Sequence, residues 1–136
     1  MCSSDLVERE PTNARALVAL AQAYWLTGRG PEVVSEIADR ARTADPSSAA
    51  AWHLWALADG SPRGRTERWQ AVVARFPDDA MARVNLADNA AGLAGAEDDP
   101  VALKLAIATY EELLARATRD EERTAVSRAL EALRGR

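Results

Sequence analysis

The stretch EREPTNARALVALAQAYWLTG, from Glu8 to Gly28, contains a proline, small polar residues and a long apolar-striped segment, in that order. Pro11 ends any preceding helix, because the residue before a proline is pushed out of helical geometry. Thr12 and Asn13 are residue types that cap a helix amino terminus. Gly28 is typical of a helix end. The apolar residues between the cap and this glycine recur at helical spacing: Leu17, Leu20, Ala21 and Tyr24.

The same order of residues occurs twice more along the chain. PTNA begins at Pro11, PSSA at Pro46 and PDDA at Pro77, so the motif recurs after 35 and then 31 residues. Nine residues after each proline stands a large apolar residue followed by alanine: Leu20-Ala21, Trp55-Ala56 and Leu86-Ala87. Prolines are few here, so the agreement of two independent spacings identifies an internal repeat.

Each repeat predicts two helices. In the first repeat the second helix begins at Pro31, ends before Asp45-Pro46, and is expected to bury Val33, Val34, Ile37, Ala38 and Ala41. In the second repeat a tight DGSP turn at residues 59–62 separates two helices. Their expected buried residues are Trp52, Trp55 and Ala56, then Trp69, Val72, Val73 and Phe76.

The third repeat predicts a helix, a longer AGAEDDP loop at residues 94–100, and a second helix begun by Asp99-Pro100. The expected buried residues are Leu86, Ala87, Ala90 and Leu93, then Leu103, Ala106, Tyr110, Leu113 and Leu114. A capping box from Thr118 to Glu121 predicts a final helix. Its apolar stripe is short and its outer face is charged, which is typical of a helix that closes a repeat stack: Val126, Ala129, Leu130 and Leu133.

These helix pairs resemble the tetratricopeptide repeat family, whose period is about 34 residues. The proline after the second helix, the alanine at the helix crossing, Tyr24 and Gly28 carry the resemblance in the first repeat. Asp59 stands where the family has an aromatic residue, and Arg83 occupies a usually apolar position. The resemblance implies an all-α, α-solenoid fold of about three helix pairs, at residues 11–45, 46–76 and 77–117. A capping helix at 119–134 would complete a single domain over 7–136.

The first six residues, MCSSDL from Met1 to Leu6, fit neither a signal peptide nor the repeat. The string resembles the translation of a sequencing adapter read in frame. We therefore expect residues 1–6 to be a non-native leader, with the natural chain beginning upstream of Val7. A native, frayed terminus is the alternative. The Ala- and Arg-rich usage is typical of a bacterial chain, and the compartment, cytoplasm or periplasm, stays open.

Composition excludes several classes of function. The net charge is −4 and the arginines are interspersed with acids, so no basic stripe is available for nucleic acid. The apolar run from Ala16 to Ala21 is too short to span a membrane. With one cysteine and one histidine, His53, the chain offers no typical zinc site. The acids at 78–79 and 97–99 stand directly before predicted helices, where they are expected to cap. We expect no cofactor, no metal and no enzymatic activity.

In the tetratricopeptide family the first helix of each pair lines a concave groove, and the resemblance transfers this role to nine positions. They are Arg15, Val18, Gln22, Trp25, His53, Leu57, Met81, Val84 and Asp88. They do not match the family's basic clamp for a terminal carboxylate. We therefore expect a protein-interaction scaffold that binds an apolar peptide or an amphipathic helix.

Two alternatives stay open. Trp25, Val18 and Met81 are also residue types that pack against neighbouring helices. The second alternative is that the chain is the structural end of a longer repeat array. It would then stack on other repeats, or form a homo-oligomer, through an exposed amino-terminal repeat face. The identity of a partner is not encoded in any motif of the sequence.

Overall fold

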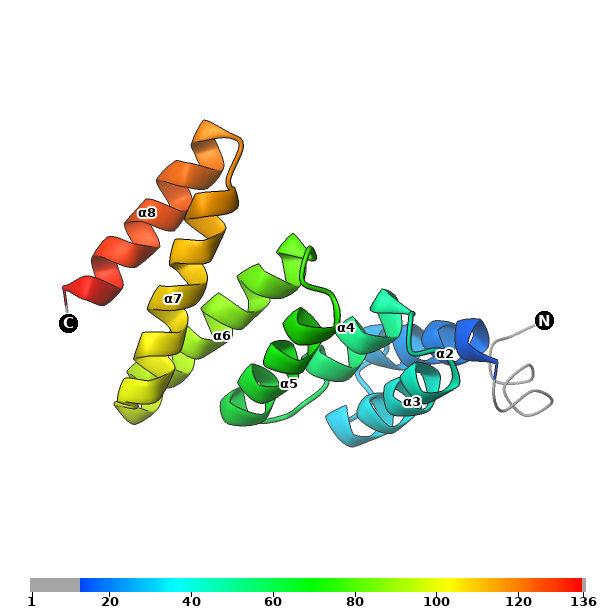
Figure 1. Ribbon diagram of the computed structural model, residues 1–136. Helices are drawn as coiled ribbons and strands as arrows, with labels where there is room; N and C mark the ends of the chain where they lie inside the picture. The colour runs from blue at the N-terminus through cyan, green and yellow to red at the C-terminus, as the bar shows by residue number, and fades with distance from the viewer. Residues whose placement is uncertain (1–12, 136) are drawn as a thin grey trace. The chain divides into compact units, whose positions relative to one another are not determined.

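The computed structural model describes residues 13–135, and over this range the chain is helical without strands (Figure 1). The described helices are α2 (Ala14–Leu26), α3 (Pro31–Ala44), α4 (Ala49–Leu57), α5 (Pro62–Arg75), α6 (Ala80–Glu97), α7 (Pro100–Arg116) and α8 (Asp120–Arg134). This confirms the all-α class. No helix in the described range is long and apolar enough to cross a membrane. The expected leader at 1–6, together with Pro11 and Thr12, lies outside the described residues.

The chain divides into two compact units, and the division falls within α5, between Arg68 and Trp69. We call residues 13–68 the amino-terminal unit and residues 69–135 the carboxyl-terminal unit. In the first, α2 packs against α3 and α4, and α3 packs against α4. In the second, α6 packs against α7, and α7 packs against α8 (Figure 1).

The third residue of the repeated motif has the same local structure at each of its three occurrences. Asn13, Ser48 and Asp79 are the N-caps of α2, α4 and α6, all with extended backbone. Each side-chain oxygen accepts a hydrogen bond from the main-chain N–H three residues further on, at 3.1, 3.3 and 3.1 Å. This bond satisfies an amide that the helix itself leaves without a partner. The alanines of the second motif are fully buried: Ala21, Ala56 and Ala87.

The amino-terminal unit has an alanine-rich core, which lets its helices approach closely. The buried cluster consists of Ala16, Leu17, Leu20, Ala21, Val34, Ile37, Ala38, Ala41, Ala51, Leu54 and Ala58. Helix α3 has the predicted bounds and α2 ends as predicted, with Gly28 in the left-handed region at φ 75°. The predicted burial of Val33 is wrong, since this side chain is 40% exposed. It lies beside the buried stripe, because its neighbour Val34 is fully buried and successive helix residues point about 100° apart.

A cluster of arginine and tryptophan side chains joins α4 to the start of α5 in this unit. Arg68 donates from Nη1 to the Trp55 carbonyl oxygen at 2.6 Å and to Ser35 Oγ at 2.7 Å. Its Nε lies 3.3 Å from Asp59 Oδ2, which forms an ion pair. Arg42 stacks over the Trp55 ring, with its guanidinium carbon 3.8 Å from the ring centroid. Asp59 is thus held by charge and hydrogen bonds.

The DGSP turn that follows Trp55 is also built from side-chain hydrogen bonds. Asp59 Oδ1 accepts from the Ser61 amide at 2.8 Å, and Ser61 Oγ accepts from the Gly64 amide at 2.9 Å, which caps α5. The bond from the Ser61 amide is the main cause that lowers the pKa of the Asp59 carboxyl, and Arg68 and Arg65 add to it. The turn therefore depends on an ionised Asp59.

The carboxyl-terminal unit has its main core where α6, α7 and α8 meet. Its buried members are Ala87, Ala90, Ala106, Tyr110, Leu130 and Leu133. A second, smaller cluster of Leu93, Ala94 and Ala102 joins the far end of α6 to the start of α7. The predicted buried stripes of α6 and of the closing helix α8 agree with these clusters. Arg83 is buried on α6 with 7% exposure, although it carries a charge.

Two boundary predictions in this unit are wrong. The loop expected at 94–100 is almost absent, because α6 continues to Glu97 and only Asp98, at φ 49°, and Asp99 separate it from α7. The alanines there favour helix, and Ala94 packs against Ala102. The capping box is not formed either. Arg119 is the N-cap of α8 without a side-chain cap bond, and three acids in the first turn favour this helix end instead.

Candidate functional site

Three of the nine predicted groove residues meet at one cavity in the carboxyl-terminal unit. Met81, Val84 and Asp88 are spaced three and four residues apart on α6, so they project from one face of that helix. None of the three is buried, and Met81 and Val84 are 62% and 43% exposed. Large apolar side chains at such exposure on one face mark a surface that can bind another apolar group.

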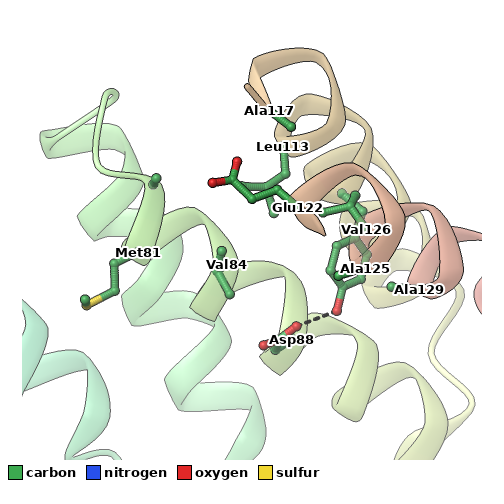
Figure 2. A pocket seen from close by; sticks show the side chains of 11 residues that line it. Met81, Val84, Asp88, Leu113, Ala117, Glu122, Ala125, Val126 and Ala129 are labelled. Atoms are coloured by element: carbon green, nitrogen blue, oxygen red, sulfur yellow. Dashed lines mark hydrogen bonds between the residues drawn. The ribbon is translucent and has the colours of Figure 1, made fainter. Parts of the chain in front are cut away.

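The cavity lies between α6, α7 and α8 and has a volume of about 460 Å³ (Figure 2). Helix α8 contributes its residues at the same helical spacing as α6, and two of them, Ala125 and Ala129, are small enough to leave the space open. The complete lining is Ala80, Met81, Val84, Asp88, Tyr110, Leu113, Ala117, Glu122, Ala125, Val126 and Ala129. Eight of these 11 residues are apolar. The volume falls within the range of about 300–1,000 Å³ that is usual for binding pockets.

The polar part of the cavity is a tyrosine–carboxylate pair. Tyr110 on α7 donates its hydroxyl hydrogen to Asp88 Oδ1 on α6 at 2.5 Å, the bond drawn as a dashed line in Figure 2. Burial raises the pKa of the Tyr110 hydroxyl well above its usual range, and the hydrogen bond and negative charge of Asp88 raise it further. The phenol therefore stays protonated at neutral pH and holds the Asp88 carboxylate in one orientation.

A second carboxylate, that of Glu122, belongs to the part of the lining contributed by α8. In Figure 2 its side chain extends from α8 over the cavity. Arg119 Nε lies 2.8 Å from Glu122 Oε1, so this carboxylate already has a cationic partner. The two acids of the cavity thus differ, since one is paired with a cation and the other with a neutral hydroxyl.

The other six predicted site residues lie on the amino-terminal unit. Arg15, Gln22 and Trp25 are exposed on α2, and Leu57 is exposed at the end of α4. Val18 packs against the core cluster of this unit, which is the helix-packing role weighed for it above. His53 is half-buried on α4. Across the described residues no group of three or more His, Cys, Asp or Glu side chains is placed to hold a metal ion.

The sequence reasoning missed the α7 and α8 part of the cavity. Tyr110, Leu113, Val126 and Ala129 are predicted core residues, and they do pack in or against the core cluster, but they also line the cavity. Glu122 and Ala125 are not among the predicted site residues. The signal was present, because residues 122, 125, 126 and 129 share one face of a helix whose apolar stripe is narrow. Small residues on that face leave a hollow instead of completing the core.

Two of the five acids expected to cap helix starts, Asp79 and Asp99, do so, whereas Glu97 is the last residue of α6 and Asp98 is its C-cap. Asp79 accepts from the Ala82 amide, and Asp99 accepts from the amides of Val101 and Ala102 at 2.9 and 3.2 Å. They are therefore parts of the scaffold.

Comparison with known proteins adds no relative, since no family model matches the chain and no curated protein matches it.

Proposed function

We propose that this protein is a tetratricopeptide-like helical scaffold that binds a peptide or helical segment of a partner protein. The site would be the cavity between α6, α7 and α8. The observation that carries the proposal is the position of Met81, Val84 and Asp88, three residues expected in the family's groove, in the lining of a largely apolar cavity.

The helix-pair interpretation has local support. The N-caps of α2, α4 and α6 recur in the same register as the repeated sequence motif. Helices α2 and α3 pack together, as do α6 and α7. Repeats of this kind bury their cores between consecutive helices and leave a surface free for a partner.

The cavity volume of about 460 Å³ is enough for at least one large apolar side chain. Burying a leucine or phenylalanine side chain contributes about 1.5–3 kcal/mol, which alone gives weak binding. A useful affinity therefore requires a segment that also covers Met81 and Val84, whose exposed apolar surface lies at the same site. A helix or an extended segment of several residues meets this requirement.

The test is a selection of displayed peptides against the full chain, followed by fluorescence anisotropy with one selected peptide. Val84→Asn removes an apolar contact from the cavity without adding charge. We expect it to weaken binding about tenfold, which corresponds to about 1.4 kcal/mol. Val101→Asn is the matched control, because Val101 is 73% exposed in the same unit and is not part of the lining. Equal affinity of the two variants, or failure to select any peptide, contradicts the proposal.

A second function, self-association within a longer array, is favoured by one observation. Trp25, Leu26 and Val33 are 44%, 83% and 40% exposed around the turn between α2 and α3. Apolar surface of this kind is also used in contacts between copies of a chain. Sedimentation velocity distinguishes the two cases: Leu26→Lys should convert a dimer to a monomer, and a wild-type chain that is monomeric at high concentration removes this candidate.

A further inference from the structure

The lining of the α6–α7–α8 cavity carries charge of only one sign. Its 11 residues include the carboxylates of Asp88 and Glu122, and no lysine, arginine or histidine. A segment that fills the cavity with an apolar side chain therefore brings its neighbouring residues next to negative charge. Electrostatic complementarity of this kind decides which of several apolar segments is accepted.

Asp88 is the carboxylate that a ligand would meet. Glu122 is paired with Arg119, whereas Asp88 bonds to the neutral hydroxyl of Tyr110. Within residues 13–135 no lysine or arginine forms an ion pair with Asp88. Its Oδ1 accepts from the tyrosine hydroxyl. Asp88 is exposed, so a ligand can reach it.

The Tyr110 bond prepares Asp88 for this role. Tyr110 is 8% exposed and packs in the core of the carboxyl-terminal unit, so its hydroxyl is held in place. Because the hydroxyl donates to Asp88, the carboxylate has a fixed direction before any ligand arrives. Less conformational freedom is then lost on binding, which favours a salt bridge that would be weak between two mobile side chains.

The spacing along α6 predicts the spacing in the ligand. Val84 and Asp88 are one helical turn apart on the same face, about 5–6 Å between their Cβ atoms. A helical ligand that places an apolar side chain near Val84 presents its residue one turn away near Asp88. The matching pattern is an apolar residue with a lysine or arginine three or four positions from it.

We infer that the cavity selects basic amphipathic segments, in which a large apolar side chain enters the cavity and a lysine or arginine pairs with Asp88. This inference rests on the proposed peptide-binding function and names the chemistry of its ligand. Acidic and purely apolar segments are disfavoured, because neither provides a cation for the carboxylate.

The test uses two fluorescein-labelled, alanine-based helical peptides of about 14 residues, each with one leucine. One peptide has a lysine four residues after the leucine, and the other has a glutamine there. We expect the lysine peptide to bind the full chain about 3- to 10-fold more tightly at low salt, with the difference lost at high salt. The glutamine peptide binds with the same affinity at both salt concentrations.

Variants separate this inference from the function on which it rests. Asp88→Asn should reduce the ratio of the affinities for the lysine and glutamine peptides to about one. Tyr110→Phe should reduce this ratio only in part, since Asp88 keeps its charge but loses its orientation. Asp98→Asn is the matched control, because Asp98 is an exposed acid of the same unit outside the lining and asparagine tolerates its left-handed backbone. It should keep the full preference.

Three outcomes would overturn the inference. Equal affinity for the two peptides, with loss of binding in Val84→Asn, overturns the charge preference and leaves the peptide-binding function in place. A lysine preference that survives Asp88→Asn overturns the assignment to Asp88. Binding that is indifferent to Val84→Asn, or no binding of either peptide, overturns the proposed function together with the inference.

Discussion

Replacing Arg68 with methionine should destabilise the amino-terminal unit, because this side chain joins three parts of it. The guanidinium bonds the Trp55 carbonyl oxygen and Ser35 Oγ, and its Nε pairs with Asp59. Methionine keeps most of the aliphatic stem and its packing, so the substitution removes mainly the polar interactions.

The magnitude follows from the exposure of these groups. A hydrogen bond to a charged group contributes about 1.5–3 kcal/mol, and the lower end applies here because water can reach the partners. The Arg68 and Asp59 side chains are 23% and 22% exposed, so they are neither fully solvated nor dry. Their ion pair adds about 0.5–1 kcal/mol, near the upper end for a surface pair. With a small contribution from the Ser35 bond, the loss is about 3 kcal/mol.

The assay is urea denaturation followed by tryptophan fluorescence, to which the amino-terminal unit contributes Trp25, Trp52 and Trp55. At a slope of about 2 kcal/mol per molar urea, a loss of about 3 kcal/mol lowers the midpoint by about 1.5 M. Arg68→Lys should recover less than half, because an ammonium lacks the planar fork that reaches several acceptors. A midpoint for Arg68→Met within 0.3 M, on the order of the usual extrapolation error, of the exposed control Arg128→Met would refute the reasoning.

Three further predictions concern the same unit and α6. Gly64→Ala should destabilise by about 1–3 kcal/mol in urea denaturation, because its Cβ would be forced against the Asp59 carboxylate. Gly92→Ala places its Cβ on α6 with nothing within 4 Å and should stabilise the chain by about 0.5–1 kcal/mol in the same assay; a loss of stability would contradict this. The pKa of Asp59 is lowered by its bonds to Ser61 and by Arg68, so its contribution should be full above the unfolded pKa of about 4 and vanish as pH falls through the lower folded value. The stability difference between wild type and Asp59→Asn, measured from pH 7 to 2.5, should be constant above about pH 5 and shrink below pH 4; a pH-independent difference would contradict this.

Helix positions could be predicted from the sequence because local chemistry determines them. Pro31 begins α3, Ser48 and Asp79 cap α4 and α6, and Gly28 ends α2. Each of these residues has a backbone or capping property that acts within a few positions. Such features need no knowledge of what the helix later packs against.

The errors arise where packing decides. The predicted loop at 94–100 is mostly helix, because Ala94 gains a packing partner in Ala102 that the sequence pattern does not reveal. Thr118 has the right residue type for a cap, but α8 begins after Arg119. Local preferences at both places are weak enough for tertiary contacts to override them.

The candidate site could be predicted only in part, for a similar reason. Met81, Val84 and Asp88 are found by counting along one helix. The contributions of Tyr110 and Ala125 depend on how α6, α7 and α8 meet. A residue of either type can fill the space between helices or leave part of it open, and its position in the sequence does not say which. Whether a given alanine completes a core or borders a cavity is decided by its neighbours in space.

The tryptophan pair of the amino-terminal unit has an optical consequence. Trp52 and Trp55 lie edge to face, with ring centroids 5.7 Å apart and an interplanar angle of 84°. Two indoles at this distance couple their ultraviolet transitions, and their mutual orientation gives the coupling one sign. The aromatic circular dichroism of the chain should therefore contain a band that belongs to residues 52–55, and a partner that displaces either ring would change this band without any label being attached.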